Sequence, residues 1–335
     1  MTQHTTQRTI GPFKVNAIGL GCMNLSHAYG VPPGPEEAKA LLLRALDLGV
    51  DLFDTAALYG FGANETLVGQ VLKPHRQRFT LASKCGMTGV DGKRVIDGRP
   101  ATLKATCDEA LQRLQTDVID LYYLHRRDFN VPIEDSVGAL ADLVSAGKIR
   151  AIGLSEVSGE TIRKAHAVHP VSAVQNEYSL WSREAEIGVV EACREVGATL
   201  VAFSPLARAF LCGELTDPQT QLTEKDIRLG MPRFSAENYA KNLQLLTPYK
   251  AIAAEVGCTP AQLALAWIMA AQPKAVSIPG TRSISHLEDN MGALKVQLSA
   301  DVVEKLNQLI NNKTVAGPRY PAATQKEIDT EQFAA

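Results

Sequence analysis

The segment DLFDTAALYG, residues 51–60, holds an apolar run that ends on an acid, Asp54, with a tyrosine, Tyr59, five residues further on. Short apolar runs of this kind, each followed by polar residues, recur along the chain, and their length and bounding turn residues are typical of buried strands. They occupy residues 17–23, 51–56, 79–84, 119–125, 151–156, 172–179, 199–205 and 275–281. The sequence therefore predicts eight strands.

Segments with the helical spacing of apolar residues separate these strands. In residues 35–50, Pro35 and two acids suit a helix start, and Ala38, Leu41 and Ala45 share one face. Further helices are predicted in 63–72, 102–114, 134–148, 159–168, 184–196, 236–272 (two helices) and 283–293. Eight alternations of strand and helix favour parallel pairing through right-handed crossovers, which predicts an α/β fold of the (β/α)8 TIM barrel type.

Three segments lie outside this alternation of strands and helices, and each has a predicted structure or position. Residues 9–18, TIGPFKVNAI, suit a β-hairpin at the bottom of the barrel. Residues 206–235 are the longest irregular connection, and such loops are usually functional, so we expect a lid there. With no break in composition, residues 1–335 are predicted to form a single domain, and we expect its C-terminal tail, 313–335 with Tyr320 and Phe333, to fold over the opening or to stay disordered.

Composition narrows the class of partner. A net charge of −2 and a pI near 6.4 leave no basic stripe for nucleic acid and no polybasic membrane patch. No signal peptide and no run of eighteen or more apolar residues is present in the sequence. The six cysteines have no CxxC spacing, which favours reduced thiols over disulfides or zinc. We expect a cytoplasmic protein whose partner is a small molecule.

The predicted strand ends bring titratable residues together. In a parallel barrel, all strand C-termini open on one face, so Asp54, Lys84 and His125 should meet there, with Tyr59 in the loop after Asp54. A phenol has a pKa of about 10, and the Lys84 cation would stabilise its phenolate while Asp54 holds the ammonium in place. His125 would polarise a carbonyl oxygen. This set suits protonation of a carbonyl oxygen while hydride arrives from elsewhere.

Each of these residues also has an ordinary explanation: a helix cap for Asp54, a loop aromatic for Tyr59, a surface cation for Lys84 and a core histidine for His125. Their joint placement at the strand ends favours the functional interpretation. GLGCMN and GFGANE lack the third glycine of a dinucleotide fingerprint, so neither predicts a phosphate loop. His166 and His169 have no third ligand with metal spacing, and no metal site is predicted.

The D-x4-Y spacing of Asp54 and Tyr59, the lysine of LASK and the histidine of LYYLH resemble the catalytic tetrad of the aldo-keto reductase superfamily, from about residue 8 to residue 312. The resemblance implies that Tyr59 is the proton donor, that Lys84 and Asp54 tune it, and that His125 orients the carbonyl. It also implies an NADPH-dependent oxidoreductase that reduces aldehydes or ketones to alcohols. The alternative, from another class, is a redox-sensing regulatory subunit that keeps NADPH but acts by binding a partner.

The second half of the chain resembles the family's cofactor segments in GLSE, QNEYS, FSPL and PGTR. The resemblance implies contacts to the carboxamide from Ser155 and Gln175, stacking of Phe203 on the nicotinamide, pyrophosphate contacts from Ser204, Leu206 and Arg208, and an adenine contact from Asn290. Thr281 precedes a predicted helix and Arg282 offers a fork for a phosphate, although a solvated Arg282 is the alternative. NADPH is therefore expected over NADH.

Two positions depart from the family pattern: Glu156 replaces an asparagine commonly found beside the serine, and His286 stands where many relatives carry a phosphate-binding arginine. Four further residues follow strand ends and are candidates to line the substrate pocket: Tyr29, Phe61, Arg126 and Trp181. The sequence does not identify the substrate.

Overall fold

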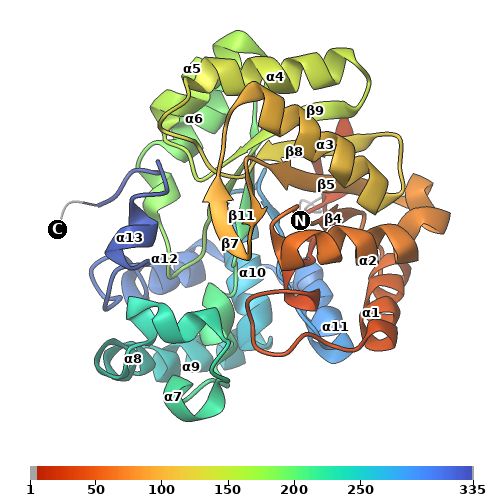
Figure 1. The fold of residues 1–335 in the computed structure, drawn as a ribbon. Helices are drawn as coiled ribbons and strands as arrows, with labels where there is room; N and C mark the ends of the chain where they lie inside the picture. Colours follow the sequence, from red (N-terminus) through yellow and green to blue (C-terminus); the bar gives the residue numbers. More distant parts are fainter. Residues whose placement is uncertain (1–5, 334–335) are drawn as a thin grey trace.

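Eight strands of the described residues form one parallel sheet that curls until its two edge strands meet (Figure 1). The protein was analysed as a computed structural model that describes residues 6–333; residues 1–5 and 334–335, at the ends of the predicted domain, lie outside it. In spatial order the strands are β3 (Leu20–Gly21), β4 (Leu52–Asp54), β5 (Thr80–Cys85), β8 (Ile119–Leu124), β9 (Ile149–Ser155), β10 (Val171–Glu177), β11 (Thr199–Phe203) and β12 (Val276–Ser277).

The barrel closes between β12 and the segment that leads into β3. Ile18 pairs with Ser277 and Gly21 with Gly280 in parallel bridges. The amide of Gly19 donates to the carbonyl of Ser277 at 2.8 Å. The predicted (β/α)8 barrel is therefore confirmed.

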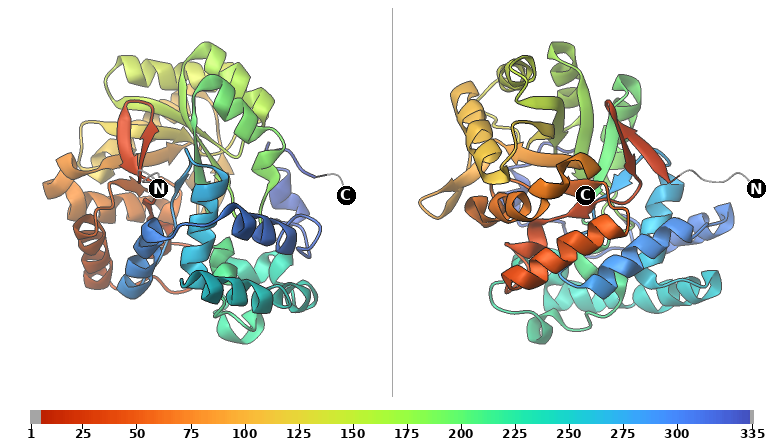
Figure 2. Two further views of the ribbon diagram at one scale, coloured as in Figure 1. Left: turned by 180° about the vertical axis from the view of Figure 1, so that it is seen from behind. Right: turned by 90° about the vertical axis from the view of Figure 1, so that its right-hand side faces the viewer.

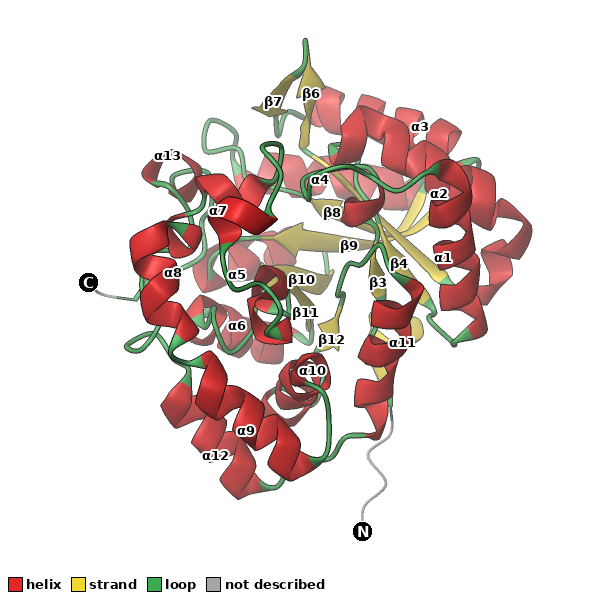
Figure 3. Ribbon diagram, turned by 90° about the horizontal axis from the view of Figure 1, so that it is seen from below, coloured by secondary structure: helices red, strands yellow, loops and turns green. Residues whose placement is uncertain are grey.

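Helices follow the strands and cover the outside of the barrel, as the view from below shows (Figure 3). The helices that follow the eight strands in turn are α1 (Pro35–Asp47), α2 (Ala63–Leu72), α3 (Pro100–Leu114), α4 (Ile133–Ser145), α5 (Gly159–Val168), α6 (Val189–Val196), α10 (Pro260–Ala271) and α11 (Ile284–Gly292). The remaining ones are α7 (Pro218–Gln221), α8 (Ala236–Leu243), α9 (Leu246–Val256), α12 (Ala300–Leu309) and α13 (Ala322–Gln325). Helix α1 begins at Pro35 with Glu36 and Glu37 in its first turn, as predicted.

The alternation of side chains along the strands divides the core into two layers. On β8, Leu121 and Tyr123 point into a cluster inside the barrel, whereas Tyr122 and Leu124 belong to the cluster between strands and helices. Both layers are apolar, which explains why the strands read as nearly continuous hydrophobic runs.

A hairpin of β1 (Gln7–Ile10) and β2 (Phe13–Asn16) closes the bottom of the barrel (Figure 2). Ile10 and Val15 are fully buried in the cluster inside the barrel. The turn uses Gly11 with a φ of +51°, where an added Cβ would lie 2.6 Å from Oγ of Ser172. The predicted hairpin is confirmed.

A second hairpin, of β6 (Met87–Val90) and β7 (Lys93–Ile96), was missed by the sequence analysis. It projects beyond the rim of the barrel (Figure 3). Its turn is Asp91-Gly92, and both residues have positive φ, which is the usual two-residue hairpin connection. The Asp-Gly pair inside VDGKR was therefore the signal that could have revealed it.

Residues 206–235 are less irregular than expected. They contain α7 and three 3-10 segments, Ala207–Cys212, Ile227–Gly230 and Pro232–Phe234. The helical turns satisfy backbone groups that a structureless loop would leave to water.

Among the described helices, no single one is long and apolar enough to cross a membrane, and only the bent pair Ala236–Val256 with Pro260–Ala271 passes on length and composition.

Candidate active site

The carboxyl ends of β4, β5 and β8 bring four titratable side chains together. Asp54 is the last residue of β4, Lys84 lies near the end of β5, and His125 follows β8. Tyr59 opens the 3-10 turn Tyr59–Gly62, which leads from β4 into α2. All four side chains are buried.

Lys84 is the centre of this group. Its Nζ donates hydrogen bonds to Oδ1 of Asp54, to the carbonyl oxygen of Thr55 at 2.9 Å and to the hydroxyl of Tyr59 at 3.2 Å. The second carboxylate oxygen of Asp54 accepts a hydrogen bond from Nε2 of Gln175 at 2.8 Å. A fully buried ammonium is thereby paired and hydrogen-bonded, as burial of a charge requires.

The pKa of Tyr59 is raised overall, whereas a nearby cation alone would lower it. Burial raises the pKa of Tyr59, and this effect exceeds the opposing effect of the Lys84 cation, so the pKa lies above its ordinary value of 10.0. For Lys84, burial lowers the pKa, but Asp54 and Tyr59 outweigh burial and raise it overall. At neutral pH the pair is therefore a protonated phenol beside an ammonium.

His125 completes the group as a neutral imidazole. Its ring lies edge-on to that of Tyr59, with 5.8 Å between the centroids. Burial, assisted by the charges of Lys84 and Arg126, lowers its pKa well below 6.5. Within the described residues, Nδ1 of His125 is buried and has no hydrogen-bond partner. A neutral imidazole can donate one hydrogen bond, which is what polarisation of a carbonyl oxygen needs.

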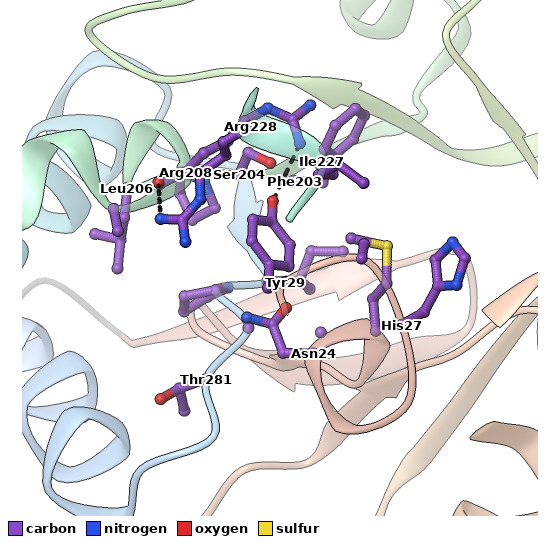
Figure 4. A pocket seen from close by; sticks show the side chains of 18 of the residues that line it. Asn24, His27, Tyr29, Phe203, Ser204, Leu206, Arg208, Ile227, Arg228 and Thr281 are labelled. Carbon is purple, nitrogen blue, oxygen red and sulfur yellow. Dashed lines mark hydrogen bonds between the residues drawn. The ribbon is translucent and has the colours of Figure 1, made fainter. Parts of the chain in front are cut away.

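A cavity of about 1020 Å³ opens beside these residues. Its lining includes Asp54, Tyr59, His125, Thr281 and Asn290. Figure 4 shows Thr281 set apart from Phe203 and Ser204. Lys84 does not line the cavity and lies behind Tyr59. A cavity of this size suits an extended cofactor together with a small substrate.

The two residues expected at the carboxamide lie at the ends of β9 and β10. Ser155 and Gln175 both line the cavity. In this structure the Gln175 amide group donates to Asp54, and Oγ of Ser155 accepts from Nη1 of Arg126 at 3.3 Å. Gln175 therefore connects the cavity wall to the Lys84–Asp54 pair.

The segment after β11 supplies the next wall, with Phe203, Ser204 and Leu206 lining the cavity. Its backbone is unusual, because Ser204, Ala207, Arg208 and Ala209 have φ values of 48°, 51°, 56° and 74°. Each non-glycine residue in the left-handed region costs on the order of 1 kcal/mol, and such strain is concentrated at functional sites.

Arg208 holds this strained segment in place. Its Nη2 donates to Oε2 of Glu177 at 2.7 Å and to the Tyr320 hydroxyl at 3.0 Å, and its Nη1 donates to the Tyr29 hydroxyl at 3.1 Å. Figure 4 shows Tyr29, Arg208 and Arg228 turned toward one another. Arg208 lines the cavity, as expected of a cofactor residue, but its guanidinium group is occupied by protein partners.

At the far end of the cavity, Thr281 and Arg282 precede helix α11. Oγ1 of Thr281 accepts from the amide of Ser283 at 3.0 Å, and Ser283 caps the helix. Arg282 is exposed, its Nη1 donates to the carbonyl of Val31, and no described carboxylate lies within ion-pair distance. Asn290, on the same helix, is buried and lines the cavity. A helix start with an unpaired arginine can hold a phosphate.

Three of the four candidates for the substrate pocket line the cavity: Tyr29, Phe61 and Arg126. The fourth, Trp181, does not, which corrects the sequence-based expectation. Its ring is buried and stacks on Phe210 with 4.3 Å between the centroids, because the chain after β10 turns it into the core. Sequence reasoning missed several other lining residues, among them Asn24, His27, Arg94, Ile227 and Arg228.

The C-terminal tail lies against the barrel opening. Tyr320, Pro321 and Thr324 line the cavity, whereas Phe333 does not and is partly exposed. The tail is tied to β9 by a buried ion pair between Arg319 and Glu156. The carboxylate of Asp329 accepts a hydrogen bond from the amide of Ser158 at 3.1 Å, and the amide of Asp329 donates one to the carbonyl oxygen of Glu156 at 3.0 Å.

This tether accounts for the unusual Glu156. Its side chain is fully buried, does not line the cavity, and accepts a hydrogen bond from the amide of Glu177 at 2.9 Å. Glu156 thus faces the tail rather than the position expected for a carboxamide.

The comparisons with known proteins agree with this fold. The Aldo/keto reductase family model matches residues 17–311. The chain is 45% identical over 329 residues to the Schizosaccharomyces pombe aldo-keto reductase yakc, whose name includes NADP(+), with 96% of each chain covered. It is 42% identical over 311 residues to "Probable aldo-keto reductase 1" of Glycine max, covering 92% of this chain and 89% of that one.

Among solved structures, the glycerol dehydrogenase AKR11B4 of Gluconobacter oxydans superposes with a TM-score of 0.84 at 26% identity, covering 96% of this chain and 99% of that one. An aldo/keto reductase of Klebsiella pneumoniae, in complex with NADP and acetate, gives 0.72 at 27% identity, with coverage of 94% and 99%. The chain belongs to the aldo/keto reductase family, and the prediction of an oxidoreductase enzyme is confirmed. The comparisons give no support to the regulatory alternative.

Proposed function

We propose that this protein reduces aldehydes or ketones to alcohols with NADPH as the hydride donor and Tyr59 as the proton donor. The observation that carries the proposal is the position of the Tyr59 hydroxyl, in the wall of the cavity and 3.2 Å from the Lys84 ammonium. A protonated phenol at this place can donate to a carbonyl oxygen bound beside it.

The residues present suit NADPH. The cavity has Ser155 and Gln175 near the reacting groups and Thr281, Arg282 and Asn290 at its other end. Arg282 would hold the additional phosphate that distinguishes NADPH from NADH. The NADP(+) in the name of the fission yeast relative and the NADP in the Klebsiella complex support this choice.

The chemistry then divides between the cofactor and the protein. NADPH, when bound, would supply a hydride for the carbonyl carbon, and Tyr59 would transfer its hydroxyl proton to the carbonyl oxygen, so that the carbonyl group becomes an alcohol. Lys84 stabilises the phenolate left on Tyr59, and Asp54 keeps Lys84 charged. His125, neutral at physiological pH, donates to the developing charge on oxygen.

Turnover with a panel of aromatic and aliphatic aldehydes and ketones tests the proposal. We expect steady oxidation of NADPH, followed by its absorbance, with one alcohol formed per NADPH consumed. Tight NADPH binding without turnover of any aldehyde or ketone in the panel would contradict the proposed reductase.

A further inference from the structure

The arginines around the cavity differ in whether a carboxylate neutralises them. Those that line it among the described residues are Arg94, Arg126, Arg208, Arg228 and Arg282. Three of these are ion-paired: Arg94 with Glu327, Arg208 with Glu177 and Arg228 with Asp226. Of the described carboxylates, none lies within 4.0 Å of Arg126 or Arg282. Arg282 lies at the proposed phosphate end, so Arg126 is the unpaired cation of the other end.

Arg126 is fixed beside the reacting groups. It directly follows His125, and its Nη1 donates to the His125 carbonyl at 2.7 Å and to Oγ of Ser155 at 3.3 Å. Its Nε and Nη2 make no hydrogen bond to any described residue and are left to the cavity that the side chain lines. Burial dominates both pKa shifts, and the positive charge of Arg126 opposes the rise in the pKa of Tyr59 and adds to the fall in that of His125, which agrees with this closeness.

Among the residues that the structure describes, no acid forms an ion pair with Arg126. Asp54, a carboxylate that lines the same cavity, is already bound by Lys84 and Gln175. The neighbouring lining residues Leu58, Phe61 and Met87 are apolar. A half-buried guanidinium without an anion loses hydration and gains little in return. A single anionic group on the substrate would supply the missing partner.

We propose that Arg126 is a specificity-determining residue that binds a carboxylate of the substrate, so that the preferred substrates are aldehydes or ketones that carry a carboxylate. The planar fork of arginine matches a carboxylate through two parallel hydrogen bonds, and Nε and Nη2 are the free donors. This inference rests on the proposed reductase activity and deepens it.

The test compares aldehydes that carry a carboxylate with their methyl esters, which are uncharged and have nearly the same shape. The 2-, 3- and 4-carboxybenzaldehydes and their methyl esters are reduced with NADPH by the full chain. For at least one isomer we expect the acid to exceed its ester in kcat/KM by roughly tenfold or more, mainly through KM, because a charged hydrogen bond contributes that much to binding. The advantage should shrink as salt is added.

Three variants locate the effect. Arg126→Met should bring the acid-to-ester ratio close to one, and Arg126→Lys should keep part of it as a point charge. Arg99→Met removes an equal charge from a side chain that is 71% exposed and outside the cavity, so it should leave the ratio within about twofold.

Two outcomes would overturn the inference: a wild-type protein that shows no preference for any of the three acids, or an Arg126→Met variant that loses acid and ester turnover equally. The second would mean that Arg126 acts only through His125 and Ser155. If no aldehyde is reduced at all, the proposed function fails, and the anion site is then tested by calorimetry with benzoate and methyl benzoate on the NADP+-saturated protein. Benzoate binding that weakens about tenfold in Arg126→Met supports the site, and absence of benzoate binding overturns it.

Discussion

The hydroxyl of Tyr59 lies 3.2 Å from Nζ of Lys84, and the same ammonium is ion-paired with Asp54. Burial raises the pKa of Tyr59 above 10.0 although Lys84 opposes the shift. The phenol therefore keeps its proton throughout the neutral range. In the proposed reaction, Lys84 would act less by making the resting phenol acidic than by stabilising the phenolate as the proton leaves.

The first prediction concerns pH. The proposed proton donor, Tyr59, would act when protonated, so reduction should be lost only as pH rises through its pKa, above 10.0. The proposed role of His125 needs a neutral imidazole, and its pKa lies well below 6.5, so it should not limit the rate at neutral pH. We expect kcat for aldehyde reduction to be nearly constant between the pKa of His125 and the pKa of Tyr59. A fall of kcat centred between pH 7 and 9, measured under saturating NADPH, would contradict the assignment of Tyr59 as donor.

The second prediction concerns coenzyme choice. Arg282→Ala should raise KM for NADPH by roughly ten- to hundredfold, since charge-assisted hydrogen bonds to a phosphate contribute about 1.5–3 kcal/mol. KM for NADH should change little, which makes NADH the internal control. Equal changes in KM for the two coenzymes would show that Arg282 does not bind the phosphate and is a solvated side chain.

The third prediction concerns the C-terminal tail. Arg319→Met leaves the buried carboxylate of Glu156 unpaired and should lower the free energy of unfolding by about 3–5 kcal/mol. Adding Glu156→Gln should recover part of this loss, because the uncompensated charge is then gone. The control is Lys148→Met, which breaks an ion pair between Lys148 and Asp108. These two side chains are 38% and 50% exposed, so the loss in free energy of unfolding should be less than about 1 kcal/mol. Thermal unfolding of the four proteins measures these differences, and an Arg319→Met variant as stable as Lys148→Met would refute the tether.

The barrel and the four reacting groups could be predicted because the relevant signals are local. Each strand is a short apolar run, and in a parallel barrel every strand ends on the same face, so Asp54, Lys84 and His125 need no long-range information to be placed together. The hairpin around Gly11 was visible for the same reason. The hairpin at Asp91-Gly92 carried a local signal too, the Asp-Gly pair of its turn, although the sequence analysis did not predict it.

Contacts between distant segments could not be predicted in the same way. The burial of Trp181 depends on Phe210, which comes from the segment after β11. The role of Glu156 depends on Arg319, 163 residues later in the chain. The carboxylates that neutralise Arg94 and Arg208 also come from distant elements, so the unpaired state of Arg126 became apparent only in the folded chain.

The most direct test of the account is the reduction of an aldehyde by Tyr59→Phe, which removes the hydroxyl and keeps the ring, with NADPH affinity measured in parallel. We predict that kcat falls by roughly 10²–10⁴-fold, the usual contribution of a positioned acid, while the Kd for NADPH stays within about twofold of wild type. A Tyr59→Phe protein that reduces the aldehyde at the wild-type rate would contradict the central claim that Tyr59 donates the proton.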